Sequence, residues 1–147
     1  MKKNVLIVDD DPGVRDSLKK VLHAAGYQVM LAAGGLEAIA HVQAHAIDLI
    51  LLDMSLPNQN GWETCRHFAR AHPSVPVIVM TGESGQFKTA LSAGASALME
   101  KPPGAEQLLQ VVQQLVTKST EPDPYRSKGI FYYVAASTGH SHHAPEG

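Results

Sequence analysis

The sequence has a single cysteine, few aromatic residues and no long apolar run. One cysteine, Cys65, excludes a disulfide within the chain and fits a reducing compartment such as the cytoplasm. The longest apolar runs are far shorter than the roughly 20 residues that a membrane-spanning helix needs. Residues 1–4 lead directly into an apolar run, so we expect no signal peptide. Together these absences favour a cytoplasmic protein with no membrane contact.

Basic runs and glycine-rich phosphate loops are also missing. The formal net charge is −2 and no cluster of Lys and Arg occurs, which argues against direct nucleic-acid binding. Nucleotide-binding folds hold phosphate on a glycine-rich loop after their first strand. Here three aspartates, Asp9 to Asp11, follow the first apolar run and would repel a phosphate unless a cation were bound. A nucleotide- or flavin-binding protein, or a small hydrolase, is therefore a disfavoured interpretation.

What the sequence does contain is a regular alternation of short apolar runs and amphipathic segments. Runs such as Val5 to Val8 are apolar on both faces and too short for helices, which is typical of buried parallel strands. The segments between them place apolar residues at helical spacing. The predicted strands are 5–8, 27–32, 49–52, 77–80 and 95–99, and the predicted helices are 12–25, 36–43, 62–72, 87–93 and 108–116. This alternation predicts an α/β fold, a doubly wound five-stranded parallel sheet.

Polar residues follow four of the predicted strands, at the point where each strand ends. They are Asp9 with Asp10, then Asp53, Thr81 and Lys101. Since the carboxyl ends of parallel strands meet at one edge of a sheet, we expect these side chains to converge. Three carboxylates brought together are unfavourable without a cation, and Mg²⁺ prefers oxygen ligands. Taken alone, Asp9 to Asp11 would also suit a turn and a helix cap.

These strand-end residues, in this order, resemble the receiver domain of response regulators in two-component signalling. The matching motifs are Val8-Asp9-Asp10, Asp53 to Pro57 with Gly61, Met80-Thr81-Gly82 and Glu100-Lys101-Pro102. The resemblance covers residues 4 to about 118. It implies a flavodoxin-like sheet with strand order 2-1-3-4-5.

The resemblance also implies a reaction. Asp53 would accept a phosphoryl group from the phosphohistidine of a sensor histidine kinase or a phosphotransfer protein. Lys101 would pair with one phosphoryl oxygen, and the Thr81 hydroxyl would donate a hydrogen bond to another. The chain would catalyse only its own phosphorylation and dephosphorylation, and would signal through protein contacts that depend on phosphorylation.

The resemblance further implies a bound Mg²⁺, or Mn²⁺ in its place. Asp10 and Asp53 would be direct ligands and Asp9 would act mainly through water. The backbone carbonyl of Ser55 would complete the set that the protein supplies.

Two features depart from the family pattern. Leu98 stands where many receivers carry a tyrosine or phenylalanine, and the interval from Thr81 to Lys101 is shorter than usual. Both fall near the fourth predicted helix, which is on the family's output face, so we hypothesise altered signalling there. The alternative function is a receiver-like docking or dimerisation module that takes no phosphate, and the complete set of polar strand-end residues argues against it.

Residues 119–147 fall outside the receiver pattern, which predicts a receiver domain over 1–118 followed by a linker and tail. Glu121 to Pro124 suggest a linker. Gly129 to Ala136 have strand-like content and would pair with a sheet edge, either the chain's own or that of a second copy in a homodimer. His140, His142 and His143 suit either a metal site or an unstructured end, and the latter is favoured. The segment is too short for a DNA-binding domain.

Overall fold

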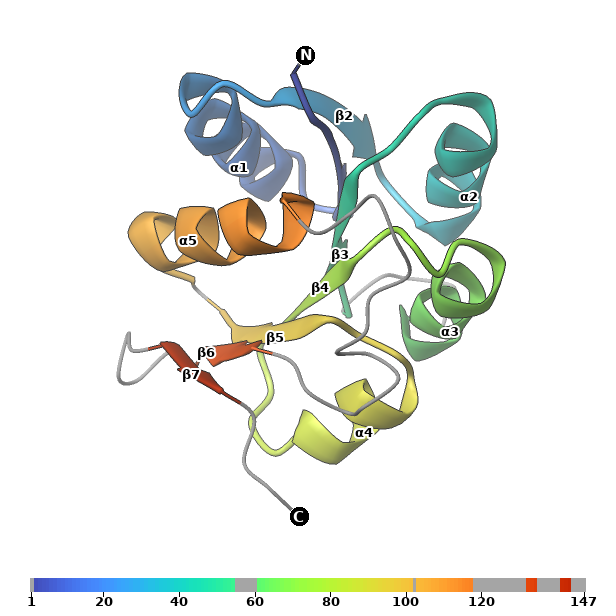
Figure 1. The fold of residues 1–147 in the computed structure, drawn as a ribbon, viewed down its shortest axis with the longest axis vertical. Coiled ribbons are helices and arrows are strands. Elements are labelled where there is room, and N and C mark those ends of the chain that lie inside the picture. The colour runs from blue at the N-terminus through green and yellow to red at the C-terminus, as the bar shows by residue number, and fades with distance from the viewer. Residues whose placement is uncertain (1, 55–60, 102, 118–131, 135–140, 144–147) are drawn as a thin grey trace.

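The structure is a computed structural model, and it describes residues 2–54, 61–101, 103–117, 132–134 and 141–143. Strands and helices alternate through most of this length (Figure 1). The strands are β1 (Asn4–Val8), β2 (Gln28–Ala32), β3 (Leu49–Asp53), β4 (Val77–Thr81), β5 (Ala97–Glu100), β6 (Tyr132–Val134) and β7 (Ser141–His143). The helices are α1 (Pro12–Ala24), α2 (Gly35–Ala44), α3 (Gly61–Ala71), α4 (Phe87–Ser92) and α5 (Ala105–Val116).

The strands form one sheet in the order β2-β1-β3-β4-β5-β6-β7. The first five are parallel, so the predicted fold class and the order 2-1-3-4-5 are confirmed. The sheet then continues beyond the expected five strands. β6 pairs with β5 in parallel and β7 pairs with β6 antiparallel. A segment near the end of the chain therefore occupies the edge of β5 on which a five-stranded sheet would have ended.

Helices cover both faces of the sheet (Figure 1). α1 and α5 lie on one face, while α2, α3 and α4 lie on the other. Alternate residues of each central strand pack on opposite faces of the sheet. Leu6, Ile50 and Leu52 pack with Phe68 of α3 in one cluster. Val5, Ile7, Leu49 and Leu51 pack in the other cluster with apolar residues of α1 and α5. Burial on both faces explains why these strands are apolar throughout.

Local capping fixes where α1 begins and ends. Asp11 has an extended backbone, and its side chain accepts hydrogen bonds from the N–H groups of Gly13, at 2.8 Å, and Val14, at 3.4 Å. Asp11 is thus the helix cap that the sequence predicts. Gly26 follows the helix with a φ of 97°, a conformation that glycine adopts without strain. The turn leads directly into β2 beside β1.

Small differences from the predicted bounds have physical causes. α5 begins at Ala105, before the predicted start at residue 108, because its first turn is polar and carries no apolar signal. β5 begins at Ala97, two residues after the predicted start at 95, because Ala95 and Ser96 belong to the connection between Gly94 and the strand. No helix in the part of the chain that the structure describes is long and apolar enough to cross a membrane. Residues 118–131 and 135–140 lie outside the described residues, so the domain division at 118 stays a prediction.

Candidate functional site at the carboxyl ends of the strands

Backbone hydrogen bonds hold the ends of the central strands level with one another. Met54 N donates to the Met80 carbonyl at 3.0 Å, which joins the end of β3 to β4. Lys101 N donates to the Thr81 carbonyl at 2.8 Å, which joins the end of β5 to β4. The residue after each strand is thereby fixed at the same edge of the sheet. The expected convergence of the polar strand-end residues follows from this geometry.

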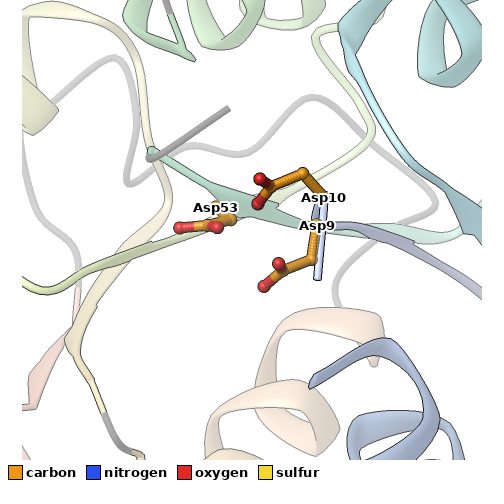
Figure 2. Close-up of side chains that lie close together, drawn as sticks. All are labelled: Asp9, Asp10 and Asp53. Carbon is orange, nitrogen blue, oxygen red and sulfur yellow. The ribbon is translucent and has the colours of Figure 1, made fainter. Parts of the chain in front are cut away.

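Asp9, Asp10 and Asp53 form a compact cluster of carboxylates at this edge. One carboxylate oxygen from each lies within 4.8 Å of the others. Figure 2 shows the three side chains projecting to the same side, two from the segment after β1 and one from the end of β3. Asp9 and Asp53 are buried, whereas Asp10 is exposed. The cluster therefore has two buried carboxylates and one that solvent can reach.

Lys101 supplies the positive charge next to this cluster. Its Nζ lies 2.9 Å from Oδ1 of Asp53 and 3.4 Å from Oδ2 of Asp9. The Lys101 side chain is 25% exposed, while both carboxylates are 1% exposed. A salt bridge of this kind is screened less than a surface pair. Lys101 thus links the ends of β1 and β3 to β5.

Burial and charge shift the pKa values of two groups in the cluster. Burial raises the pKa of Asp9, and the neighbouring Asp53 carboxylate adds to this effect. The Asp11 N–H and Lys101 oppose it without cancelling it. For Lys101, burial alone would lower the pKa, but the hydrogen bond and charge of Asp53, followed by those of Asp9, raise it overall. Lys101 is therefore charged at neutral pH, and the cluster disfavours a further negative charge.

Thr81 completes the set of predicted side chains at this edge. It ends β4 and is buried, and its Oγ1 accepts a hydrogen bond from Glu83 N at 3.1 Å. A hydroxyl that accepts in this way still has its own proton to donate. The next residue, Gly82, has open space where a Cβ would stand. Residue 82 therefore places no side chain next to Thr81.

Two supporting contacts were not predicted from the sequence. Nη1 of Arg15 donates to the Asp9 carbonyl at 2.6 Å, which holds the backbone where β1 meets the cluster. Asp11 N donates to Oδ1 of Asp9 at 2.9 Å, so Asp9 accepts hydrogen bonds on both of its oxygens. The only available signal was the position of Arg15 in the first turns of α1, close to the predicted strand end.

Some predicted features lie outside the described residues. Ser55, whose carbonyl was expected to be a metal ligand, is among them, as is His140. His142 and His143 belong to β7, for which the structure describes the backbone only. Leu98 is buried in β5, as its apolar character suggests. Cys65 is fully buried in α3, which fits the interpretation of this thiol as a small apolar residue.

Comparison with known proteins agrees with this geometry. Residues 5–113 match the response regulator receiver domain family. Response regulator MprA of Mycolicibacterium vanbaalenii is 34% identical over 125 residues, which are 84% of this chain and 54% of that protein. The chain thus spans about half the length of the curated relatives it matches.

Solved structures show the same fold. A receiver domain protein from Methanospirillum hungatei, described as CheY-like, superposes with a TM-score of 0.77 and 31% identity, covering 81% of this chain and 97% of that one. TrrA from Thermotoga maritima, solved in complex with Mg²⁺ and BeF, superposes with a TM-score of 0.71 and 28% identity, covering 77% and 98%. From its sequence match, its fold and its acidic strand-end cluster, the chain belongs to the receiver domain family of two-component response regulators.

Proposed function

We propose that this chain accepts a phosphoryl group on Asp53 in a reaction that depends on Mg²⁺ or Mn²⁺. The donor is the phosphohistidine of a sensor histidine kinase or a phosphotransfer protein. The covalent product is an aspartyl phosphate: a carboxylate oxygen of Asp53 forms a bond to phosphorus while the bond from phosphorus to the donor's histidine nitrogen breaks, and the donor imidazole leaves. Phosphorylation then changes the protein contacts that the chain makes. We expect the chain to act on no other substrate.

A single observation supports the proposal most strongly. Asp53 shares its surroundings with Asp9 and Asp10 on one side and with Lys101 Nζ, 2.9 Å away, on the other. A carboxylate that only capped a loop would not require two more carboxylates and an ammonium group around it. This combination suits a nucleophile that must approach a phosphate of the same sign, because the developing charge needs compensation.

The carboxylate cluster has the chemistry of a site for a small hard cation. Asp10 and Asp53 are proposed as direct ligands and Asp9 as a ligand through water. The hydrogen bonds already accepted by both oxygens of Asp9 support that division. Ser55 is proposed to contribute its carbonyl. When bound, Mg²⁺ would neutralise part of the charge on the phosphoryl oxygens.

The chain's own residues orient the reaction. Lys101 already contacts Oδ1 of Asp53 and would transfer its contact to a phosphoryl oxygen once the carboxylate became an ester-like acyl phosphate. Thr81 would donate its hydroxyl proton to a second oxygen. The backbone bond from Lys101 N to the Thr81 carbonyl keeps these two groups in fixed relation. Both therefore act by position and charge.

The relatives support the choice of cation and phosphate chemistry. TrrA was solved with Mg²⁺ and BeF, and we extend that chemistry to this chain because its fold and family are shared. The donor and the output remain part of the proposal, because the chain spans only about half of MprA. A cytoplasmic location fits a donor kinase whose catalytic part is inside the cell.

The proposal is tested by intact-mass spectrometry of the full chain with acetyl phosphate, a small phosphodonor, with Mg²⁺ or with a chelator. We expect one phosphoryl adduct that requires the cation. Asp53→Asn should form none, because the amide is not a nucleophile in this reaction. Asp16→Asn is the matched control, since Asp16 is an exposed aspartate of α1 paired with Lys20, and it should behave like the wild type.

The alternative function predicts a different result. A docking or dimerisation module that takes no phosphate would show no adduct at any Mg²⁺ concentration. An adduct that persisted in Asp53→Asn would place the phosphoryl group on another residue. Either result would contradict the proposal.

A further inference from the structure

Tyr133 makes two contacts that tie the tail strand β6 to the body of the domain. Its hydroxyl donates to Oε2 of Glu100 at 2.6 Å. Its ring meets the ring of Phe87 edge to face, with centroids 6.2 Å apart. Glu100 is the last residue of β5 and Phe87 is the first residue of α4. One tail side chain therefore contacts both strand β5 and helix α4.

The backbone of β6 covers that same edge. Tyr132, Tyr133 and Val134 pair in register with Ala97, Leu98 and Met99 of β5. Figure 1 shows β6 lying along β5, with α4 and α5 to either side. An uncovered strand edge is a template for pairing with another chain. The described strand β6 has three residues, and the side-chain contacts that the structure describes for it are those of Tyr133.

Both contacts of Tyr133 lead to the candidate site. Glu100 directly precedes Lys101 and pairs in register with Thr81. Phe87 ends the loop that starts at Thr81, whose Oγ1 accepts from Glu83 N at 3.1 Å. Glu100 and Phe87, the two partners of Tyr133, therefore lie on the same two segments as Lys101 and Thr81.

We propose that β6 is a displaceable cover of the β5 edge and that Tyr133 holds it in place. Phosphorylation of Asp53, here called loading, releases it. In the unloaded chain, Glu100 and Phe87 are placed so that Tyr133 contacts both at once. Engagement of Lys101 and Thr81 by a phosphoryl group changes the relative position of β5 and the loop before α4, and Tyr133 loses one partner. The freed surface comprises the β5 edge and Phe87.

This coupling acts in both directions. If phosphorylation weakens docking of β6, then undocking of β6 must favour the phosphorylated state by the same factor at equilibrium. Tyr133 is thus a positioning residue that acts on the site through Glu100 and Phe87. The inference rests on the proposed function for its phosphorylation step, while the docking itself is independent of it.

The test is hydrogen–deuterium exchange of the full chain, followed by mass spectrometry of peptides that contain residues 132–134. Tyr133→Phe keeps the ring and removes the donor to Glu100, and we expect roughly tenfold faster exchange of this segment because a hydrogen bond to a carboxylate is lost. Glu100→Gln should move exchange in the same direction. Tyr27→Phe, on a tyrosine that packs against the core cluster of α1 and α5, is the matched control and should leave exchange unchanged.

Loading is tested with acetyl phosphate and Mg²⁺ in the same experiment, with intact mass measured in parallel. We expect exchange at 132–134 to rise toward the Tyr133→Phe level in the wild type and not in Asp53→Asn. We also expect Tyr133→Phe to reach a higher phosphorylated fraction than Tyr27→Phe at equal donor concentration. These shifts at a distant site are not expected from a purely structural tyrosine.

The contrary outcomes separate the two proposals. An adduct on Asp53 with unchanged exchange at 132–134 overturns the displaceable cover and leaves the proposed function intact. Unchanged exchange in both Tyr133→Phe and Glu100→Gln overturns the role of Tyr133 in docking. Absence of any adduct contradicts the proposed function. It also contradicts the release of β6 by phosphorylation, whatever the Tyr133 variants show.

Discussion

Lys101 Nζ lies 2.9 Å from Oδ1 of Asp53, although the two residues belong to strands separated by β4. The same ammonium group lies 3.4 Å from Oδ2 of Asp9. Lys101 therefore compensates two buried carboxylates at once. A phosphoryl group attached to Asp53 would meet this ammonium group immediately, so the geometry of the unloaded chain is already close to what the proposed reaction needs.

Replacing Lys101 should destabilise the chain when no divalent cation is present. Lys101→Met leaves Asp9 and Asp53 buried without their counter-charge, and we expect a loss of about 1–3 kcal/mol in the free energy of unfolding. Urea unfolding in a chelator measures it. Lys20→Met removes an exposed pair with Asp16 at 3.1 Å, and its loss should stay below about 0.5 kcal/mol. Equal losses in the two variants would contradict the compensating role of Lys101.

Mg²⁺ should stabilise the folded chain through the acidic cluster. A ligand that binds only the folded state at about 100 times its Kd adds about 2.7 kcal/mol. We expect a rise in Tm with Mg²⁺ that is lost in Asp10→Asn and in Asp53→Asn. Asp16→Asn, an exposed change on α1, should keep the full rise. Thermal unfolding against Mg²⁺ concentration tests this, and an undiminished rise in Asp10→Asn would remove Asp10 from the proposed ligands.

Tyr133 should titrate later than an ordinary tyrosine. Its hydrogen bond to the Glu100 carboxylate, with burial and the charge of Glu100, raises the pKa of Tyr133 from 10.0 to about 12. Because the folded-state pKa is raised, the contact contributes its full stability below pH 10.0 and loses it as the pH rises to about 12. Docking of β6 should therefore weaken in strongly alkaline solution.

The ultraviolet absorbance of tyrosinate measures this titration. The chain has four tyrosines, so the late transition is assigned as the one missing from Tyr133→Phe. In Glu100→Gln the carboxylate is gone, and the same transition should move back toward pH 10.0. If Tyr133→Phe removed no late transition, the assignment would be contradicted.

Gly94, between α4 and β5, should resist replacement for two separate reasons. Its φ is 82°, and a Cβ there would lie 2.6 Å from the Cβ of Ala69 on α3. Gly94→Ala should therefore cost about 2–4 kcal/mol, from backbone strain together with overpacking. Gly26→Ala shares the strain, with a φ of 97°, but meets no atom within 4 Å, so about 1–2 kcal/mol is expected.

Urea unfolding of the two glycine variants separates strain from contact. Gly82→Ala is the control, since its position has neither a positive φ nor a neighbour within 4 Å. Equal costs for Gly94→Ala and Gly26→Ala would show that α3 moves away from α4 without penalty. That result would contradict the tight packing of Gly94 against Ala69.

The five-stranded core was predictable because its signals are local. Each central strand is a short apolar run, and each special side chain follows one directly, as Asp53 follows Leu49–Leu52. The rules for parallel sheets then bring the strand ends together without knowledge of any contact. The positions of Asp9, Asp10, Asp53, Thr81 and Lys101 at one edge agree with that reasoning. Their chemical roles stay a prediction.

The tail contact was beyond such reasoning because its partners are distant in the chain. Gly129 to Ala136 have strand-like content, but nothing in the sequence selects an edge or a register for them. The bond from Tyr133 to Glu100 depends on a register that pairs Tyr133 with Leu98. The bond from Arg15 to the Asp9 carbonyl likewise depends on how α1 leaves the sheet. Such contacts follow from packing and not from periodicity.

The most direct measurement is to map the phosphoryl group on the chain. The full chain is treated with acetyl phosphate and Mg²⁺, and the acyl phosphate is reduced with borohydride, which converts a phosphorylated aspartate to homoserine. Peptide sequencing by mass spectrometry then locates the converted residue. We predict conversion at Asp53 alone, dependent on Mg²⁺. Conversion at Asp9 or Asp10, or at no residue while the chain remains folded, would contradict the assignment of Asp53 as the phosphoryl acceptor.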